Sequence, residues 1–375
     1  MAKVIDDYLR NKAEELVFVE LQPGKKIELK EVIINGETPL PILVKEMSSQ
    51  VTTKADVDFS ITAFVEGMIR IIGIDSTFKH KDTYIAFLNA YHEEVYKGAL
   101  SKGFESVNRE LMKDALIYFR AAYILAPEHV DALYNYARCL EDIAVSDEKL
   151  YSAFSQEAFK LFGKMRELYP EHYLSYFHLG FHYSNSHDYG HAKELWTSAL
   201  KLNITDDIKK ELVNLLKDND AKMTFERGYE FIVEGHASEG LDLLLPLEDD
   251  YDDWWNLLFF IGLAYRQLER YEDAIEYFEK TLQYNTGHVD TMNEIGICLM
   301  SIGVYEEAER YFKEALKADI NNHELLCNLG IVYLNQGKLE DAEIYLSRAF
   351  EANPEDEITN SWISYLKELQ NKFNN

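Results

Sequence analysis

The chain has 375 residues and a formal net charge of −28 at pH 7, because 66 Asp and Glu outnumber 38 Lys and Arg. So acidic a chain is repelled by phosphate backbones and by anionic lipid surfaces, which argues against nucleic-acid binding and against direct membrane insertion. Hydrophobic residues make up 47% of the chain and aromatic residues 13%, so it has ample material for a packed core.

Residues 1–80 are predicted to form a small N-terminal α/β or α+β domain of unknown family. Residues 4–16 have the pattern of a short amphipathic helix. Turn-forming pairs, Pro23-Gly24 and Asn35-Gly36, separate three segments of strand-like composition, VFVEL, KIELKEVII and PILVKEM. Residues 54–72 then predict an apolar helix that Gly73 closes.

Three features of the sequence bear on where the protein works. The first residues lack the apolar core of a secretion signal, and no stretch is long and apolar enough to predict a membrane span. Cys139, Cys298 and Cys327 have no paired spacing, which favours a reducing compartment. We therefore expect a cytoplasmic protein.

The rest of the chain is periodic. Four glycines recur at intervals of 34 residues, at Gly228, Gly262, Gly296 and Gly330. Twelve residues after each glycine stands a small residue: Gly240, Ala274, Ala308 and Ala342. Four residues further on stands a large apolar one: Leu244, Phe278, Phe312 and Leu346. Small residues let two helices approach closely, and the large ones fill the space beside the crossing, so each period predicts a pair of packed helices.

These columns resemble the tetratricopeptide repeat family. Residues 323–356, HELLCNLGIVYLNQGKLEDAEIYLSRAFEANPED, carry L-G-x-x-Y, the A-x-x-x-L core of the second helix, Ala349 and the closing Pro354. Residues 255–288 match almost as well. The resemblance covers about three quarters of the chain and implies an all-α, right-handed superhelical solenoid of antiparallel helix pairs.

We predict an array over residues 81–356 with about seven units. Their ranges are 96–129, 130–172, 173–206, 221–254, 255–288, 289–322 and 323–356. Two insertions break the register, nine residues at about 141–149 and fourteen at 207–220. Residues 357–375 are predicted to form a C-terminal capping helix in which Ile358, Trp362, Ile363, Tyr365 and Leu366 cover the last repeat.

In this family the first helix of each repeat lines the concave groove with the residues three before and one after the glycine column. The resemblance therefore implies a peptide- or protein-binding groove at Tyr134, Arg138, Phe177, Phe181, Phe225, Tyr229, Phe259, Leu263, Asn293 and Ile297. Most of these are apolar, as expected of a partner site. Two alternatives stay open: the side chains pack on one another, or the N-terminal domain fills the groove. The cationic clamp of the family members that bind chaperone tails is absent.

Five histidines lie at residues 172–191. His178 and His182 are spaced i, i+4 on a predicted helix, so both could reach one metal ion, with His187 or His191 completing the site. The glutamate of the zinc-protease motif is missing between them. Histidines on the surface or between helices are the more common explanation of such a cluster, and no cofactor is predicted.

Three functions are compatible with these patterns. The first is a non-catalytic scaffold or adaptor that binds a protein or peptide segment, and self-association is possible. The second is an intracellular peptide-sensing regulator whose array controls the N-terminal domain. The third is an enzyme with its activity in residues 1–80, which would require a deep polar pocket there. Phosphate-binding loops, dinucleotide fingerprints and nucleophile elbows are absent from the sequence, so we predict that the protein is not an enzyme.

Overall fold

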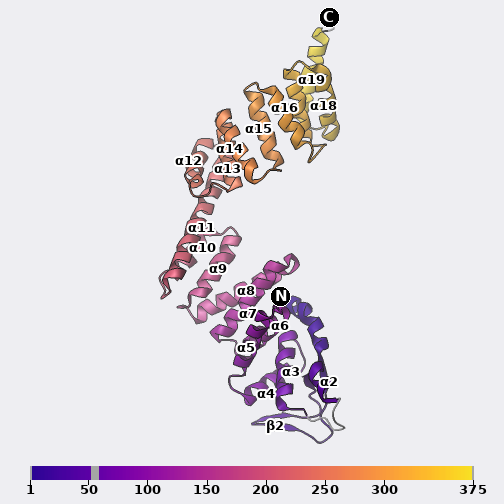
Figure 1. Ribbon diagram of the computed structural model, residues 1–375, viewed down its shortest axis with the longest axis vertical. Coiled ribbons are helices and arrows are strands. Elements are labelled where there is room, and N and C mark those ends of the chain that lie inside the picture. Colours follow the sequence, from indigo (N-terminus) through magenta and orange to yellow (C-terminus); the bar gives the residue numbers. More distant parts are fainter. Residues whose placement is uncertain (1, 52–58, 374–375) are drawn as a thin grey trace. The chain divides into compact units, whose positions relative to one another are not determined.

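The computed structural model describes residues 2–51 and 59–373. The chain divides into two compact units, Met1–Leu216 and Lys217–Asn375, and the division falls inside helix α11 (Asp206–Val233). Both units consist largely of helices, and the strands lie in the N-terminal region (Figure 1). This is the predicted helical solenoid with a small strand-containing region at its N-terminus.

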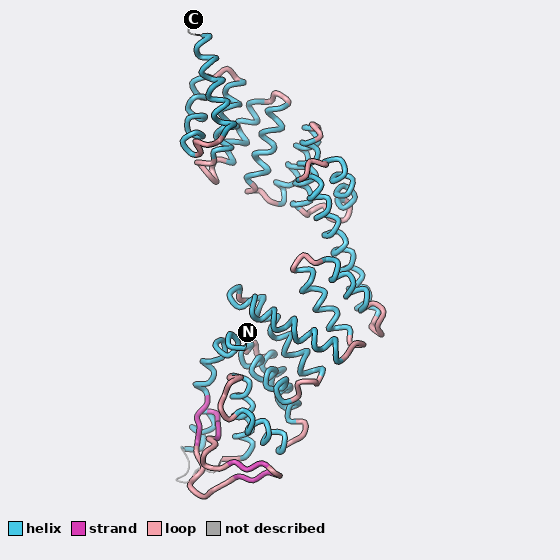
Figure 2. The backbone as a smooth tube through the Cα atoms, turned by 180° about the vertical axis from the view of Figure 1, so that it is seen from behind, coloured by secondary structure: helices cyan, strands magenta, loops and turns pink. Residues whose placement is uncertain are grey.

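The N-terminal region mixes short helices with two antiparallel two-stranded sheets. Its elements are α1 (Ala2–Leu9), the 3-10 helix η1 (Arg10–Glu15), β1 (Leu16–Val19), β2 (Ile27–Leu29), β3 (Val32–Ile34), β4 (Leu40–Leu43) and α2 (Val44–Val51). Strand β1 pairs antiparallel with β4, and β2 pairs antiparallel with β3 (Figure 2). The segment KIELKEVII is therefore a hairpin that turns at Lys30 with φ of 53°, and the prediction of a strand through PILVKEM is wrong beyond Leu43, where α2 begins.

Helix α3 (Ile61–Ile74) differs from its prediction at both ends. It begins at residue 61, where the Ser60 side chain accepts a hydrogen bond from the backbone N–H of Ala63 at 3.3 Å. Residues 54–58 of the predicted helix lie outside the described residues. Gly73 does not end the helix but lies inside it, because a Cβ there would stand 2.2 Å from the carbonyl oxygen of Ile117. The glycine serves close packing against α6 (Met112–Leu125).

Helix pairs follow through the rest of the first unit. Helix α4 (Lys81–Tyr91) comes first. The pairs are α5 (Val95–Asn108) with α6, α7 (Val130–Ser146) with α8 (Glu148–Leu168), and α9 (Tyr173–Asn185) with α10 (Tyr189–Ala199). The insertion at 141–149 forms no loop. It lengthens α7 and α8, which meet at Asp147, whose side chain accepts a hydrogen bond from the N–H of Lys149 at 3.0 Å.

The second unit continues the pairing. Its helices after α11 are α12 (Ala237–Glu248), α13 (Trp255–Gln267), α14 (Tyr271–Tyr284), α15 (Val289–Ser301), α16 (Tyr305–Ala315), α17 (His323–Asn335), α18 (Leu339–Ala352) and α19 (Glu357–Phe373). The insertion at 207–220 lies within α11, which has 28 residues. Both insertions are thus helical.

The glycine column works by close approach, as predicted. A Cβ on Gly262 would lie 2.7 Å from the Phe278 ring, and one on Gly296 would lie 2.6 Å from the Phe312 ring. In the first unit, a Cβ on Gly180 would lie 2.2 Å from Nε1 of Trp196. Since real Cβ atoms do not come so near, the large residue of each second helix occupies the space that glycine leaves on the first.

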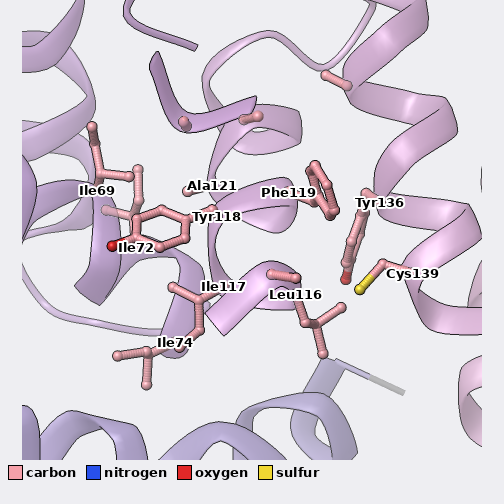
Figure 3. Close-up of a cluster of buried hydrophobic side chains, with 14 of the residues drawn as sticks. Ile69, Ile72, Ile74, Leu116, Ile117, Tyr118, Phe119, Ala121, Tyr136 and Cys139 are labelled. Atoms are coloured by element: carbon pink, nitrogen blue, oxygen red, sulfur yellow. The ribbon is translucent and has the colours of Figure 1, made fainter. Parts of the chain in front are cut away.

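One continuous core joins the N-terminal region to the helices that follow. Ile5 and Leu9 of α1 are almost fully buried in the same cluster as Leu116 of α6 and Phe154 of α8. Figure 3 draws part of this cluster, with Ile69 and Ile72 of α3, Ile117 and Tyr118 of α6, and Tyr136 and Cys139 of α7. The domain boundary at residue 80 stays a prediction, because the core crosses it.

The C-terminal helix covers the last repeat with fewer residues than predicted. Leu366 is 3% exposed, and Trp362 and Ile363 pack against the core of the second unit. The predicted contribution of Ile358 and Tyr365 is wrong, because these side chains are 63% and 48% exposed.

Candidate functional site

A cavity of about 420 Å³ opens beside helices α7 and α9. Four of the predicted groove residues line it: Tyr134 and Arg138 from α7, and Phe177 and Phe181 from α9. Helix α8 adds Tyr151 and Ser155, and the start of α11 adds Ile208 and Glu211. We call this cavity the α7–α9 pocket.

Helical spacing explains why these side chains share one wall. Tyr134, Arg138 and Glu141 are separated by four and three residues, so they lie along one face of α7. Phe177 and Phe181 are four residues apart on α9 and lie on one face for the same reason. Each helix therefore presents a stripe to the pocket.

The apolar wall of the pocket is held in place by ring contacts. The rings of Phe177 and Phe181 meet edge to face with centroids 5.1 Å apart, and Phe181 meets Trp196 in the same way at 5.3 Å. Trp196 is almost fully buried, and its Nε1 donates a hydrogen bond to the carbonyl oxygen of Phe177 at 3.0 Å. Phe177 and Phe181 remain partly exposed, so a rigid apolar surface is available to a ligand.

The polar part of the pocket centres on Glu141. Its carboxylate oxygens lie 2.9 Å from Nδ1 of His178 and 3.0 Å from Nε2 of His182, and its side chain is 15% exposed. Burial alone would raise the pKa of Glu141, but the contacts with the two histidines outweigh it and lower the pKa to about 2. The carboxylate is therefore charged at every ordinary pH.

The same geometry bears on the predicted metal site. His178 and His182 do come together, but each contacts the Glu141 carboxylate. The expectation that His187 or His191 completes the site is wrong: His191 Nδ1 lies 2.7 Å from Asp188, and His187 Nδ1 lies 3.2 Å from the Tyr189 hydroxyl. Over residues 2–51 and 59–373, no group of three or more potential ligands could hold a metal ion.

Arg138 supplies the positive charge of the pocket. Its guanidinium lies 3.3 Å from Glu141 and 2.9 Å from Asp142, and its side chain is 44% exposed. Glu211 of α11 also lines the pocket and is exposed. The two lining carboxylates, Glu141 and Glu211, outnumber the single arginine.

Both sequence insertions contribute to the pocket. Glu141, Ala144 and Val145 come from the insertion at 141–149, and Ile208 and Glu211 come from the insertion at 207–220. The groove rule of the family missed all five, because it counts positions within a regular repeat. The sequence feature that could have pointed to these five residues is the interruption of the repeat spacing by the two insertions.

The other predicted groove residues belong to the second unit, where aromatic contacts hold them together. Phe225 contacts Trp254 with centroids 4.6 Å apart, Tyr229 contacts Phe260 at 4.8 Å, and Phe259 contacts His288 at 5.2 Å. Asn293 accepts a hydrogen bond from the Asn328 side-chain amide at 2.9 Å. Leu263 and Ile297 are partly buried and pack on the core. Trp254 and Phe260 were not predicted as part of this surface.

Comparison with known proteins identifies the repeats. Residues 255–288 and residues 287–355 each match a tetratricopeptide repeat family. No curated protein matches the chain significantly. No described helix is both long enough and apolar enough to span a membrane.

Similar solved structures have low identity. MamA residues 41 to the end from Desulfovibrio magneticus RS-1 is 20% identical, with 40% of this chain and 85% of that chain covered and a TM-score of 0.38. YrrB, described as a tetratricopeptide repeat protein with an unusual peptide-binding site, is 17% identical, with 66% and 97% covered and a TM-score of 0.29. The first such domain of Spaghetti (RPAP3), solved with an HSP90 peptide, is 16% identical, with 31% and 92% covered and a TM-score of 0.30. Because these TM-scores are below 0.5, function has to be inferred from the chain's own residues.

Proposed function

Because the chain is a tetratricopeptide repeat protein, we propose that it is a non-catalytic interaction scaffold that binds a peptide segment of a partner protein in the α7–α9 pocket. The main support for the proposal is which parts of the sequence supply the residues that line the pocket. Regular repeat positions supply Tyr134, Phe177 and Phe181, and the two insertions add five further lining residues, Glu141, Ala144, Val145, Ile208 and Glu211. The departures from a regular array thus coincide with a cavity of ligand size.

The pocket favours an apolar anchor residue in the peptide. Phe177, Phe181 and Tyr134 give a partly exposed aromatic surface, and burying one large apolar side chain against it contributes about 1.5–3 kcal/mol. Such an anchor alone gives weak binding, so further contacts are needed for micromolar affinity. Repeat scaffolds obtain these from their extended concave surface.

Polar groups around the anchor site define the flanking residues. Asn185 is exposed at the pocket, and its side-chain amide is suited to pair with a peptide backbone. Asp142 and Glu211 are exposed carboxylates near the mouth. We therefore propose a ligand in which a basic residue stands beside the apolar anchor, in keeping with the net charge of −28.

The test is selection of peptides from a random library on the full chain, followed by measurement of Kd by fluorescence polarisation. Phe177→Ala and Phe181→Ala should each weaken a selected peptide at least tenfold, which corresponds to about 1.4 kcal/mol. Glu211→Gln should weaken it less, and the effect should shrink at high salt.

Tyr284→Ala is the matched control, because Tyr284 is 50% exposed on α14 and takes no part in the pocket. It should leave the Kd unchanged. Selected peptides that bind the two phenylalanine variants as tightly as the wild type would place the binding surface elsewhere. A pool of selected peptides without an apolar anchor would argue against the pocket in the same way.

The alternative of a peptide-sensing regulator is supported by one contact. Tyr8 of α1 meets Phe154 of α8 edge to face at 5.4 Å, and Phe154 stands between the pocket residues Tyr151 and Ser155. Peptide binding that moves α8 would then disturb this ring contact and so change the N-terminal region. Hydrogen exchange should fall or rise in residues 2–15 on adding a selected peptide, and unchanged exchange there would exclude this regulatory role.

A further inference from the structure

A second cavity, of about 680 Å³, lies in the first unit between η1, α2, α3, α5 and α6. Its lining is far more charged than that of the α7–α9 pocket and shares no residue with it. Five cationic side chains line it: Lys12, Lys45, Arg70, Lys102 and Arg109. Six carboxylates line it: Glu14, Glu15, Glu46, Glu66, Glu105 and Asp114.

The floor of this cavity is a buried ionic network. Arg70 of α3 is 4% exposed and contacts Asp114 at 2.8 Å and Glu15 at 2.5 Å. Glu66, one turn earlier on α3, accepts hydrogen bonds from the Tyr118 hydroxyl and from Lys102. The residues of α3 from 63 to 74 are otherwise apolar, and they are buried on every face. Apolar side chains of similar size would stabilise such a helix at least as well, so stability alone does not account for these charges.

One donor of the network lacks an acceptor. The Nε of Arg70 is buried and has no hydrogen-bond partner among the described residues. A buried guanidinium donor without an acceptor costs about 1–3 kcal/mol, a cost that a ligand oxygen in the cavity would remove. Nη1 and Nη2 of Arg70 already contact Asp114 and Glu15, so one oxygen of a ligand carboxylate would suffice for Nε, in a charge-assisted hydrogen bond.

The rim offers a second unpaired cation. Arg109 is exposed at the end of α5 and makes no ion pair within the described part of the chain. Glu105 lies four residues before it, in the last turn of α5, and is likewise exposed, with no cation contacting it among the described residues. A positive and a negative group thus stand side by side at the entrance.

We propose that this cavity binds a small zwitterion of the α-amino-acid class, either a free amino acid or the end of a short peptide. The ligand carboxylate pairs with Arg109 and Arg70, and the ligand ammonium group pairs with Glu105. The lining excludes a polyanion such as a phosphate ester, because its six carboxylates outnumber its five cations. A neutral zwitterion satisfies both rim charges without adding net charge.

The two hydroxyl groups in the lining of this cavity, those of Ser106 and Tyr118, are suited to binding a ligand and not to attacking it. The Ser106 hydroxyl donates to the carbonyl oxygen of Lys102 at 2.8 Å and is therefore engaged. Burial and the neighbouring Glu66 raise the pKa of Tyr118, which keeps its hydroxyl protonated. A deep polar pocket in this region is what an enzyme would have needed, but neither hydroxyl is activated as a nucleophile.

The experiment uses the full chain and two readouts, the Tm by differential scanning fluorimetry and the Kd by isothermal titration calorimetry. The probes are each of the twenty free L-amino acids, trialanine, and N-acetyl-alanine amide, which has neither charge. At least one amino acid, or trialanine, should raise the Tm, and the blocked compound should leave it unchanged. Amino acids acting alone identify a free-amino-acid site, whereas a stronger effect of trialanine identifies a peptide terminus.

Variants locate the site. Arg109→Ala and Glu105→Gln should each weaken the active probe at least tenfold, and Arg166→Ala, an exposed arginine on α8, should not change it. Arg70→Lys keeps the charge but loses the unpaired Nε donor and should also weaken it, provided that circular dichroism shows the native fold. If Arg70→Lys does not fold, the two rim variants decide. Binding by none of the probes, equal binding of N-acetyl-alanine amide, or an unchanged Kd in both rim variants would overturn the proposal.

Discussion

Oε2 of Glu141 on α7 lies 2.9 Å from Nδ1 of His178 on α9, so a carboxylate that is 15% exposed links the two helices that carry the candidate peptide pocket. Its other oxygen lies 3.0 Å from His182, one turn further along α9. The contact makes the separation of these helices depend on charge as well as on packing.

The first prediction concerns the pH dependence of stability. Contacts with the histidines, acting against burial, lower the pKa of Glu141 from 4.5 to about 2. A lowered carboxyl pKa contributes stability above its unfolded value, and this is lost as the pH falls from about 4.5 towards 2. Glu141→Gln should therefore lower the free energy of unfolding just above pH 4.5, and the difference from wild type should shrink across that range.

Urea denaturation at a series of pH values measures this difference. Glu167→Gln, at an exposed position of α8, is the control and should change stability little at any pH. A difference between wild type and Glu141→Gln that is the same at pH 6 and below pH 3 would mean that the carboxylate charge is not the cause.

The second prediction concerns the glycine column. Gly296→Ala should destabilise the protein by about 1–3 kcal/mol, because the new Cβ would stand 2.6 Å from the Phe312 ring. Gly163→Ala, also inside a helix, has nothing within 4 Å of the new Cβ and should be neutral or stabilising by up to about 1 kcal/mol. Urea denaturation of the two variants compares them directly, and equal effects would show that close helix approach is not what glycine provides.

The third prediction concerns the C-terminal helix. Leu366→Ala should lower the free energy of unfolding of the second unit by about 2–5 kcal/mol, because the side chain is 3% exposed. Ile358→Ala, at a side chain that is 63% exposed on the same helix, should change it by less than about 0.5 kcal/mol. Thermal denaturation of both variants tests the assignment, and a larger effect of Ile358→Ala would contradict the burial of Leu366 and the exposure of Ile358.

The fourth prediction concerns the thiols. Burial raises the pKa of Cys139 and of Cys298 to about 12, and Cys327 is buried as well. Because the thiolate is the reactive form, none of the three cysteines should react with Ellman's reagent in the native protein, and all three should react in denaturant. Rapid reaction of one thiol before unfolding would show that its helix pair opens readily.

Prediction from the sequence succeeded where the spacing of residues within a repeat or a helix decides the structure. The 34-residue spacing predicted helix pairs, and the close approach of Gly262 to Phe278 shows why that spacing is strict. It also placed Tyr134, Arg138, Phe177 and Phe181 near one another, and these residues line one cavity. In each case the periodicity of a helix decides which side chains share a face.

Prediction from the sequence failed where contacts between distant parts of the chain decide the structure. Gly73 has the pattern of a helix end, but α3 continues through it because the backbone of Ile117 packs there. Ile358 and Leu366 are both apolar and are eight residues apart on α19, yet Leu366 is buried and Ile358 is exposed, which helical spacing alone does not predict. The Glu141 contact with His178 joins residues 37 positions apart on different helices, and no repeat rule relates them.

The continuity of the core across residue 80 bears on how the protein can be divided in the laboratory. A fragment that begins at residue 81 would lose Ile5, Leu9 and Ile72, which belong to the same buried cluster as Leu116 and Ile117. Such a fragment would be prone to aggregate, and a loss of partner binding in it would report misfolding instead of a missing contact. Point substitutions that leave this core intact are therefore the sound way to assign roles to the N-terminal region.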